Sequence, residues 1–150
     1  NANNKKALII GAGGVVPSII VALKRIGVEK IFLKNRTAEN TKNLKVLYPE
    51  INIINWEDIT NVDIIINATS VGLNKGEKLD IDIKKFGENK FFYDVIYNPK
   101  ETEFLKEAKS FGNIVENGKM MFIYQAHQAF SVWHKILPEI DNEVIKIVEK

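Results

Sequence analysis

The chain has 150 residues, of which 45% are hydrophobic and 27% charged, and its formal net charge at neutral pH is +2. A chain of this length is expected to form one domain with a full hydrophobic core. The absence of cysteine excludes disulfides, thiolate nucleophiles and zinc–thiolate clusters in this chain. The lysines are scattered and form no basic block, so the sequence does not predict a nucleic-acid-binding surface.

Short runs of β-branched and aromatic residues alternate with helical stretches along the chain. Strands are predicted at 6–10, 30–34, 51–55, 62–69, 90–96 and 113–116, and helices at 16–27, 37–47, 101–111, 119–136 and 141–149. This alternation predicts an α/β fold with a doubly wound, mostly parallel, Rossmann-like sheet and helices on both faces. Residues 1–4 are set aside as a linker or expression remnant, and 5–150 are assigned to the domain.

Neither a metal nor a membrane is expected as a partner. The only imidazoles are His127 and His134, and both are interpreted as residues on the polar face of a helix rather than as catalysts. The sequence contains neither an apolar run long enough to span a bilayer nor a signal-peptide pattern, so a cytoplasmic protein is expected.

The long predicted helix near the C-terminus is interpreted as mostly structural. Its large apolar side chains are expected to lie in the core rather than against a cofactor, and they are Met121, Ile123, Phe130 and Trp133.

Three glycines follow the first predicted strand and open the first predicted helix. Gly11 permits a tight turn, and Gly13 allows the backbone to approach a pyrophosphate without a Cβ between them. Free amide groups and the helix dipole at this position favour an anion. Val16 stands where the G-x-G-x-x-G pattern has its third glycine, and Pro17 follows where the first helical turn tolerates proline. The pattern predicts a dinucleotide site, and the alternative is a tight turn without a ligand.

The end of the second predicted strand indicates which dinucleotide binds. An NAD site usually has an acidic residue there, whereas this chain has Asn35, Arg36 and Thr37. A guanidinium offers a planar fork to a 2′-phosphate, and Thr37 adds a hydroxyl at the start of the next helix. NADP is therefore the predicted cofactor. The alternative is a solvated surface arginine followed by an ordinary helix cap.

Six segments occur in the order and spacing of the shikimate dehydrogenase family, and the chain resembles the C-terminal NADP-binding domain of that family over nearly its whole length. The segments are GAGG (11–14), NRT (35–37), NATSVGL (67–73), YDVIYNP (93–99), NGKMM (117–121) and YQAHQAFSVWHKILP (124–138). GAGG is common to many dinucleotide folds, but the others are specific as a set. The resemblance implies an oxidoreductase of aromatic amino-acid biosynthesis that reversibly reduces 3-dehydroshikimate to shikimate with NADPH.

The resemblance also implies two groups of site residues. The cofactor group is Gly11, Ala12, Gly13, Gly14, Val15, Asn35, Arg36, Thr37, Ala68, Thr69, Ser70, Val95, Met120 and Met121. In this group loop 68–70 passes along the ribose and phosphate, and the two methionines lie against the nicotinamide. The substrate group is Tyr97 and Gln125, the latter bonding shikimate hydroxyls. From the residues alone, the alternatives are a polar turn at 67–70 and a half-buried loop aromatic at Tyr97.

Two departures from the family pattern bear on function. The family's N-terminal substrate domain, whose Lys–Asp pair carries the proton transfer, is absent from this chain, so no catalytic residue and no activity of the isolated domain are expected. Asn40 stands where many members have a second phosphate-binding arginine, which weakens the expected preference for NADP. The alternatives are the cofactor domain of a quinate/shikimate dehydrogenase or of a glutamyl-tRNA reductase-like enzyme, and a non-catalytic nucleotide-binding module.

Overall fold

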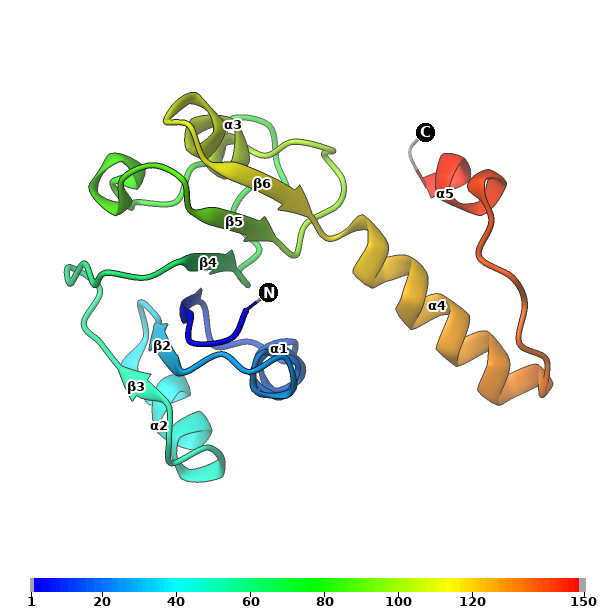
Figure 1. The fold of residues 1–150 in the computed structure, drawn as a ribbon, viewed down its shortest axis with the longest axis horizontal. Coiled ribbons are helices and arrows are strands. Elements are labelled where there is room, and N and C mark those ends of the chain that lie inside the picture. Colours follow the sequence, from blue (N-terminus) through cyan, green and yellow to red (C-terminus); the bar gives the residue numbers. More distant parts are fainter. Residues whose placement is uncertain (1, 149–150) are drawn as a thin grey trace.

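The computed structural model describes residues 2–148, apart from the side chain of Ala38. Its sheet has six parallel strands in the order β3-β2-β1-β4-β5-β6 (Figure 1). The strands are β1 (Lys6–Ile10), β2 (Lys30–Lys34), β3 (Asn52–Ile53), β4 (Ile64–Asn67), β5 (Phe91–Asp94) and β6 (Ile114–Asn117). The direction of winding reverses between β1 and β4, and open α/β sheets bind their ligands at such a switch point. The predicted doubly wound parallel sheet is confirmed.

Helical segments connect and follow the strands. They are α1 (Val16–Arg25), α2 (Ala38–Leu47), the short 3₁₀ helix η1 (Ile83–Phe86), α3 (Glu103–Ser110), α4 (Lys119–His134) and α5 (Asn142–Val148). Pro17 lies in the first turn of α1, where its missing N–H costs no intrahelical bond. The hydroxyl of Thr102 accepts a bond from the amide of Leu105 and so caps α3. The sequence did not predict η1.

The core lies on both faces of the sheet because successive strand side chains point to opposite sides. Ile9, Leu33 and Ile66 pack with α1 and α2 on one face. Leu8 and Phe92 pack with η1 and α3 on the other. Residues 7–10 of β1 are fully buried, as expected for a central parallel strand covered by helices on both sides. The prediction of helices on both faces is confirmed.

Strand β4 is shorter than the predicted strand at 62–69, and its own last side chain explains where it ends. The Asn67 carboxamide oxygen accepts hydrogen bonds from the Thr69 amide, at 3.0 Å, and from the Thr69 hydroxyl, at 2.7 Å. The Asn67 amide donates to the carbonyl of Val71 at 3.2 Å. These bonds fold the chain into a turn directly after Asn67, so the apolar run cannot continue as a strand.

Helix α4 leaves the sheet and turns back into α5, so that the two form an arm beside the body of the domain (Figure 1). We call residues 2–118 the body and residues 119–148 the arm. Of the apolar side chains of α4 that the sequence assigned to the core, Ile123 is buried and Met121 is half-buried. Phe130 and Trp133 are 42% and 76% exposed, so that prediction was wrong for both.

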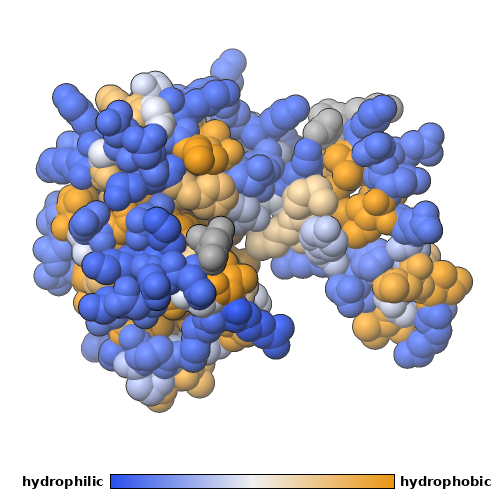
Figure 2. All heavy atoms as spheres, in the orientation of Figure 1, coloured by the Kyte–Doolittle hydropathy of each residue, from blue (hydrophilic) through white to orange (hydrophobic). Residues whose placement is uncertain are grey.

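The exposure of these aromatic side chains follows from where α4 points. It runs away from the sheet and contacts α5. Figure 2 shows hydrophobic side chains at the surface of this arm. The described residues include no helix long and apolar enough to cross a membrane.

Candidate functional site

The loop after β1 is held directly against the ends of the neighbouring strands. Gly11 has a φ of +110°, and a Cβ there would lie 2.8 Å from the carbonyl oxygen of Ala68. The Gly11 amide donates to the carbonyl of Lys34 at 2.8 Å. Only glycine allows this conformation together with this approach of two backbones. The sequence-predicted tight turn at Gly11 is thus the point where β1, β2 and β4 meet.

The next two glycines face open space. A Cβ on Gly13 or Gly14 would meet no atom within 4 Å, and both residues are exposed. Helix α1 begins here, and its N-cap residue Val15 makes no side-chain capping bond. In the first turn the amide of Val16 donates to the carbonyl of Gly13 at 3.1 Å, and Pro17 has no N–H. The open surface over Gly13 and Gly14, at the start of a helix, fits a phosphate group.

The end of β2 places a cation beside the start of α2. Arg36 and Thr37 are exposed, and Thr37 is the N-cap of α2 without a side-chain capping bond. The side-chain amide of Asn35 donates to the carbonyl of Thr37 at 2.7 Å and holds the turn. The guanidinium, the free hydroxyl and the start of a helix therefore lie together at the surface, as an anionic group requires.

Sequence reasoning missed the side chain of Lys34, which lies immediately before this turn. Lys34 is fully buried, its ammonium donates to the carbonyl of Asp58 at 2.7 Å and lies 5.7 Å from the ring of Trp56. Burial lowers the pKa of Lys34, while the nearby charges of Asp58 and Glu57 act in the opposite direction. Lys34 fastens loop 55–58 against β2. Lysines are mostly exposed, and nothing in the sequence near Lys34 indicates that this one is buried.

The ends of β4 and β5 share a buried polar network that the sequence also did not reveal. Asn67 and Asp94 are adjacent in the register of the two strands, and both are fully buried. The side-chain amide of Asn67 donates to Asp94 Oδ1 at 3.1 Å. Asp94 Oδ2 accepts from the hydroxyl of Thr102 at 2.6 Å. The network therefore links the turn that contains Thr69 to the start of α3.

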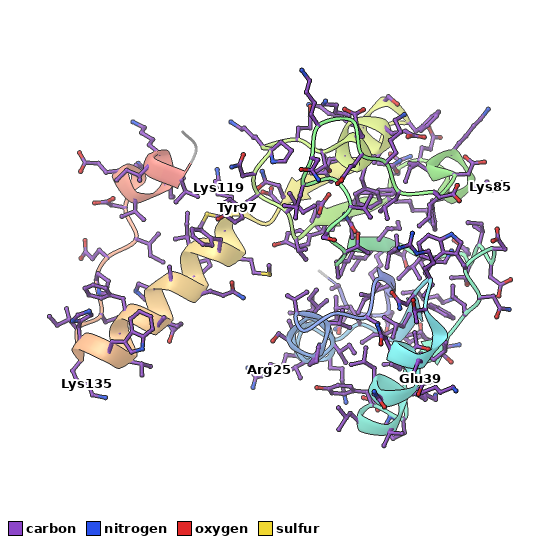
Figure 3. All side chains as sticks on the ribbon, turned by 180° about the vertical axis from the view of Figure 1, so that it is seen from behind. Arg25, Glu39, Lys85, Tyr97, Lys119 and Lys135 are labelled. Carbon is purple, nitrogen blue, oxygen red and sulfur yellow. The ribbon has the colours of Figure 1, made fainter. Side chains whose placement is uncertain are left out.

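The junction of body and arm carries further predicted site residues. A Cβ on Gly118 would overlap the carbonyl oxygen of Val95, so only glycine allows β5 and the start of α4 to meet this closely. Tyr97, labelled in Figure 3, lies at the same junction. Its ring stacks on Phe122 of α4 with centroids 4.4 Å apart and planes at 21°. Tyr97 is thus half-buried between the strand-end loop and the arm, and its position agrees with both readings of the sequence.

The structure brings most of the predicted residues to one edge of the sheet. The loops after β1, β2, β4 and β5 all leave the carboxyl ends of parallel strands, and α4 begins at the end of β6. The half-buried predicted residues are Ala12, Val15, Asn35, Thr69, Val95, Tyr97, Met120 and Met121, whereas Ala68 is buried and Ser70 is exposed. Gln125 lies apart from the strand ends, exposed on α4.

The candidate site is an open edge rather than an enclosed pocket. A hollow of about 580 Å³ lies elsewhere, along the outer side of α1 beside Arg25 and Tyr48. Another, of about 220 Å³, lies between α4 and α5 and is mostly apolar. Within residues 2–148, no three His, Asp or Glu side chains are grouped so that they could hold a metal ion.

Comparison with known proteins identifies the family. A profile of the shikimate/quinate 5-dehydrogenase family matches residues 1–107. This chain belongs to that family. The resemblance seen in the six sequence segments is thereby confirmed.

Relatives within the family are similar to this chain over almost its whole length. The shikimate dehydrogenase (NADP(+)) of Pelagibacter ubique is 58% identical over 149 residues, which are 99% of this chain and 56% of that protein. A chorismate mutase/shikimate 5-dehydrogenase fusion protein from Clostridium acetobutylicum superposes with a TM-score of 0.83 at 30% identity, over 99% of this chain and 55% of that one. A shikimate dehydrogenase solved in complex with NADP⁺ superposes with a TM-score of 0.81 at 33% identity, over 98% and 54%. The chain spans about half the length of the relatives that it matches.

Proposed function

We propose that this chain is the NADP(H)-binding domain of a shikimate dehydrogenase, the enzyme that reduces 3-dehydroshikimate to shikimate with NADPH. One observation carries the proposal. At the switch point of the sheet, the start of α1 has open space above Gly13 and Gly14, and Arg36 is exposed after the neighbouring strand β2. The first arrangement suits a pyrophosphate and the second a 2′-phosphate.

In this proposal each strand-end loop has its own part in holding the cofactor. The glycine loop binds the pyrophosphate, and Asn35, Arg36 and Thr37 bind the phosphorylated adenosine ribose. Loop 68–70 lies along the other ribose, and Val95, Met120 and Met121 line the nicotinamide. The bound cofactor supplies a hydride. The chain orients it, and Tyr97 and Gln125 contact the substrate.

We further propose that a substrate domain with the proton-transfer groups completes the enzyme. The chain spans 56% of its Pelagibacter relative, and the candidate site is open on one side. The arm exposes Phe130, Val132 and Trp133, and large apolar side chains that are exposed together commonly mark a contact surface. With this second domain the proposed function is a cytoplasmic biosynthetic reduction.

Calorimetric titration of the 150-residue chain tests the binding part of the proposal. Saturable binding of NADPH, with weaker binding of NADH, is expected. A chain that shows no saturable binding of either nucleotide would contradict the proposal and favour a structural module. The chain alone is expected not to turn over shikimate, whereas the full-length protein is expected to do so.

A second candidate is a member of the family that uses quinate or accepts NAD. Asn40, exposed in the first turn of α2, leaves Arg36 as the only arginine at this end of the site. Comparing kcat/KM of the full-length protein for shikimate and quinate, each with NADP⁺ and NAD⁺, distinguishes the two candidates.

A further inference from the structure

The carboxylate of Asp94, at the end of β5, is fully buried, and all of its hydrogen bonds come from neutral groups. Oδ1 accepts from the Asn67 side-chain amide at 3.1 Å and from the Ile96 backbone amide at 3.0 Å. Oδ2 accepts from the Thr102 hydroxyl at 2.6 Å. None of the ion pairs among residues 2–148 includes Asp94. Buried carboxylates are usually paired with a cation, so this one requires an explanation.

The geometry of the surrounding donors favours the ionised form of Asp94. The Asn67 and Ile96 nitrogens can only donate, and both meet Oδ1. The Thr102 hydroxyl oxygen already accepts a bond from the amide of Leu105, which leaves its proton for Oδ2. Burial is the largest influence and raises the pKa of Asp94 above its ordinary value, while the three hydrogen bonds that it accepts act in the opposite direction. The donors around the carboxylate are all neutral, and their arrangement suits its ionised form.

The position of this charge in the sheet relates it to one half of the dinucleotide. If the glycine loop after β1 holds the pyrophosphate and the end of β2 holds the adenosine ribose, the nicotinamide half extends to the other side of the switch point, over β4 and β5. Asp94 ends β5, next to β4 in the sheet. In Figure 1 the arrowheads of β5 and β6 point toward α4, whose first turn carries Met120 and Met121.

We propose that the buried Asp94 carboxylate is a fixed negative charge at the nicotinamide end of the site, which favours the positively charged oxidised ring over the neutral reduced ring. This inference rests on the proposed binding of NADP(H). The interaction acts through a medium of low polarity, where charges interact more strongly than in water. Asp94 contacts neither ligand in this proposal and is a positioning residue that biases the equilibrium of the hydride transfer toward NADP⁺.

The dissociation constants of NADP⁺ and NADPH, measured by calorimetry on the same chain, test the inference. The two ligands carry identical phosphates and differ by one positive charge on the nicotinamide ring. The ratio of their dissociation constants therefore reports the effect of protein charges near that ring. In Asp94→Asn the affinity for NADP⁺ is expected to fall about fivefold to tenfold relative to that for NADPH. An equal change for both ligands would show that Asp94 only supports the fold and would overturn the inference.

Two matched variants separate charge from structure. Asp80→Asn makes the same change of charge at an exposed side chain on the surface, and its ratio is expected to equal that of the wild type. Thr102→Ser keeps the hydroxyl donor to Asp94 Oδ2 and removes only a buried methyl group, so the protein should lose stability without a change in the ratio. A ratio in Thr102→Ser that moves as far as in Asp94→Asn would overturn the inference, because packing would then explain both.

A measurement on the wild type covers the case in which Asp94→Asn does not fold. Raising the salt concentration from about 50 mM to about 500 mM screens exposed charges but hardly screens a buried one. Both affinities should therefore fall, while their ratio stays within about twofold. A larger change in the ratio of the two dissociation constants would show that exposed groups discriminate between NADP⁺ and NADPH, and it would overturn the inference. Absence of any saturable binding by the wild type would instead contradict the proposed function.

Discussion

The body and the arm bury the same kinds of side chain to opposite degrees. In the body, residues 7–10 of β1 are fully buried, and Phe92 of β5 lies between the rings of Phe86 and Phe104. In the arm, Ile123 is the only residue of α4 that is buried among those described, and Trp133 is 76% exposed. An apolar pattern in the sequence therefore identifies the apolar face of a helix, but it does not identify the element that covers this face.

The difference arises from how each region finds its neighbours. In the body, helices return over the sheet and cover both faces of its central strands, because parallel strands require crossover connections. Within residues 2–148 the arm follows the last strand, β6. Within the arm, α4 contacts α5, which contains no buried residue, and Phe122 of α4 stacks on Tyr97 of the body. The proposed two-domain enzyme would account for the exposure of the arm.

The comparison is tested most strongly by truncating one aromatic side chain in each region. Phe92→Ala is expected to lower the free energy of unfolding by about 3–5 kcal/mol, because it leaves a cavity between two other rings. Trp133→Ala should change it by about 0.5 kcal/mol or less, since an exposed side chain loses little packing. Urea unfolding of both variants of this chain provides the measurement. Similar losses in the two variants would contradict the division into body and arm.

The joint between the regions is tested at Gly118. A Cβ at this position overlaps the carbonyl oxygen of Val95, so Gly118→Ala must displace the start of α4 and is expected to cost about 3 kcal/mol. Gly14→Ala is the matched control, because a Cβ there meets no atom within 4 Å. This control should unfold like the wild type in a thermal melt but bind NADPH more weakly. A Gly118→Ala variant as stable as the wild type would show that the arm is not held at this contact.

The edge of the body is tested at Arg36. Charged hydrogen bonds contribute roughly 1.5–3 kcal/mol, so Arg36→Ala should weaken NADPH binding by about tenfold to a hundredfold and barely change NADH binding. The effect should shrink at high salt, because part of it is attraction between exposed charges. If calorimetry shows NADH binding the wild type as tightly as NADPH, or the variant losing both alike, Arg36 does not read the 2′-phosphate. Asn40 in place of a second arginine would then be the first residue to examine.

The smallest expected effect concerns the arm, at Gln125. In the full-length protein Gln125→Ala should weaken shikimate binding much more than NADP⁺ binding, because a lost neutral hydrogen bond costs about 0.5–1.5 kcal/mol. Dissociation constants of both ligands provide the measurement. Ala126→Gly, on the next exposed position of α4, controls for a general weakening of the helix. Equal losses for both ligands in Gln125→Ala would indicate a packing role instead.

The sequence determined the features that depend on neighbouring residues. The predicted bounds of β1 and β2 agree with the structure, and α1 begins at Val16 as expected, because apolar runs, glycines and a proline act locally on the backbone. The alternation of strands and helices was sufficient for the parallel sheet. The positions of Gly13, Gly14 and Arg36 at one edge followed from the same reasoning, since all three come directly after strands.

Only the tertiary structure decided which distant groups meet. The register between β4 and β5 places Asn67 beside Asp94, and Lys34 is buried because loop 55–58 returns over β2. The local sequence pattern predicts neither contact. The residues concerned are 27 and 24 positions apart in the chain and meet only once the sheet has formed. The exposure of Trp133 has the same origin. Periodicity fixes which face of a helix is apolar, whereas burial depends on the position of every other element.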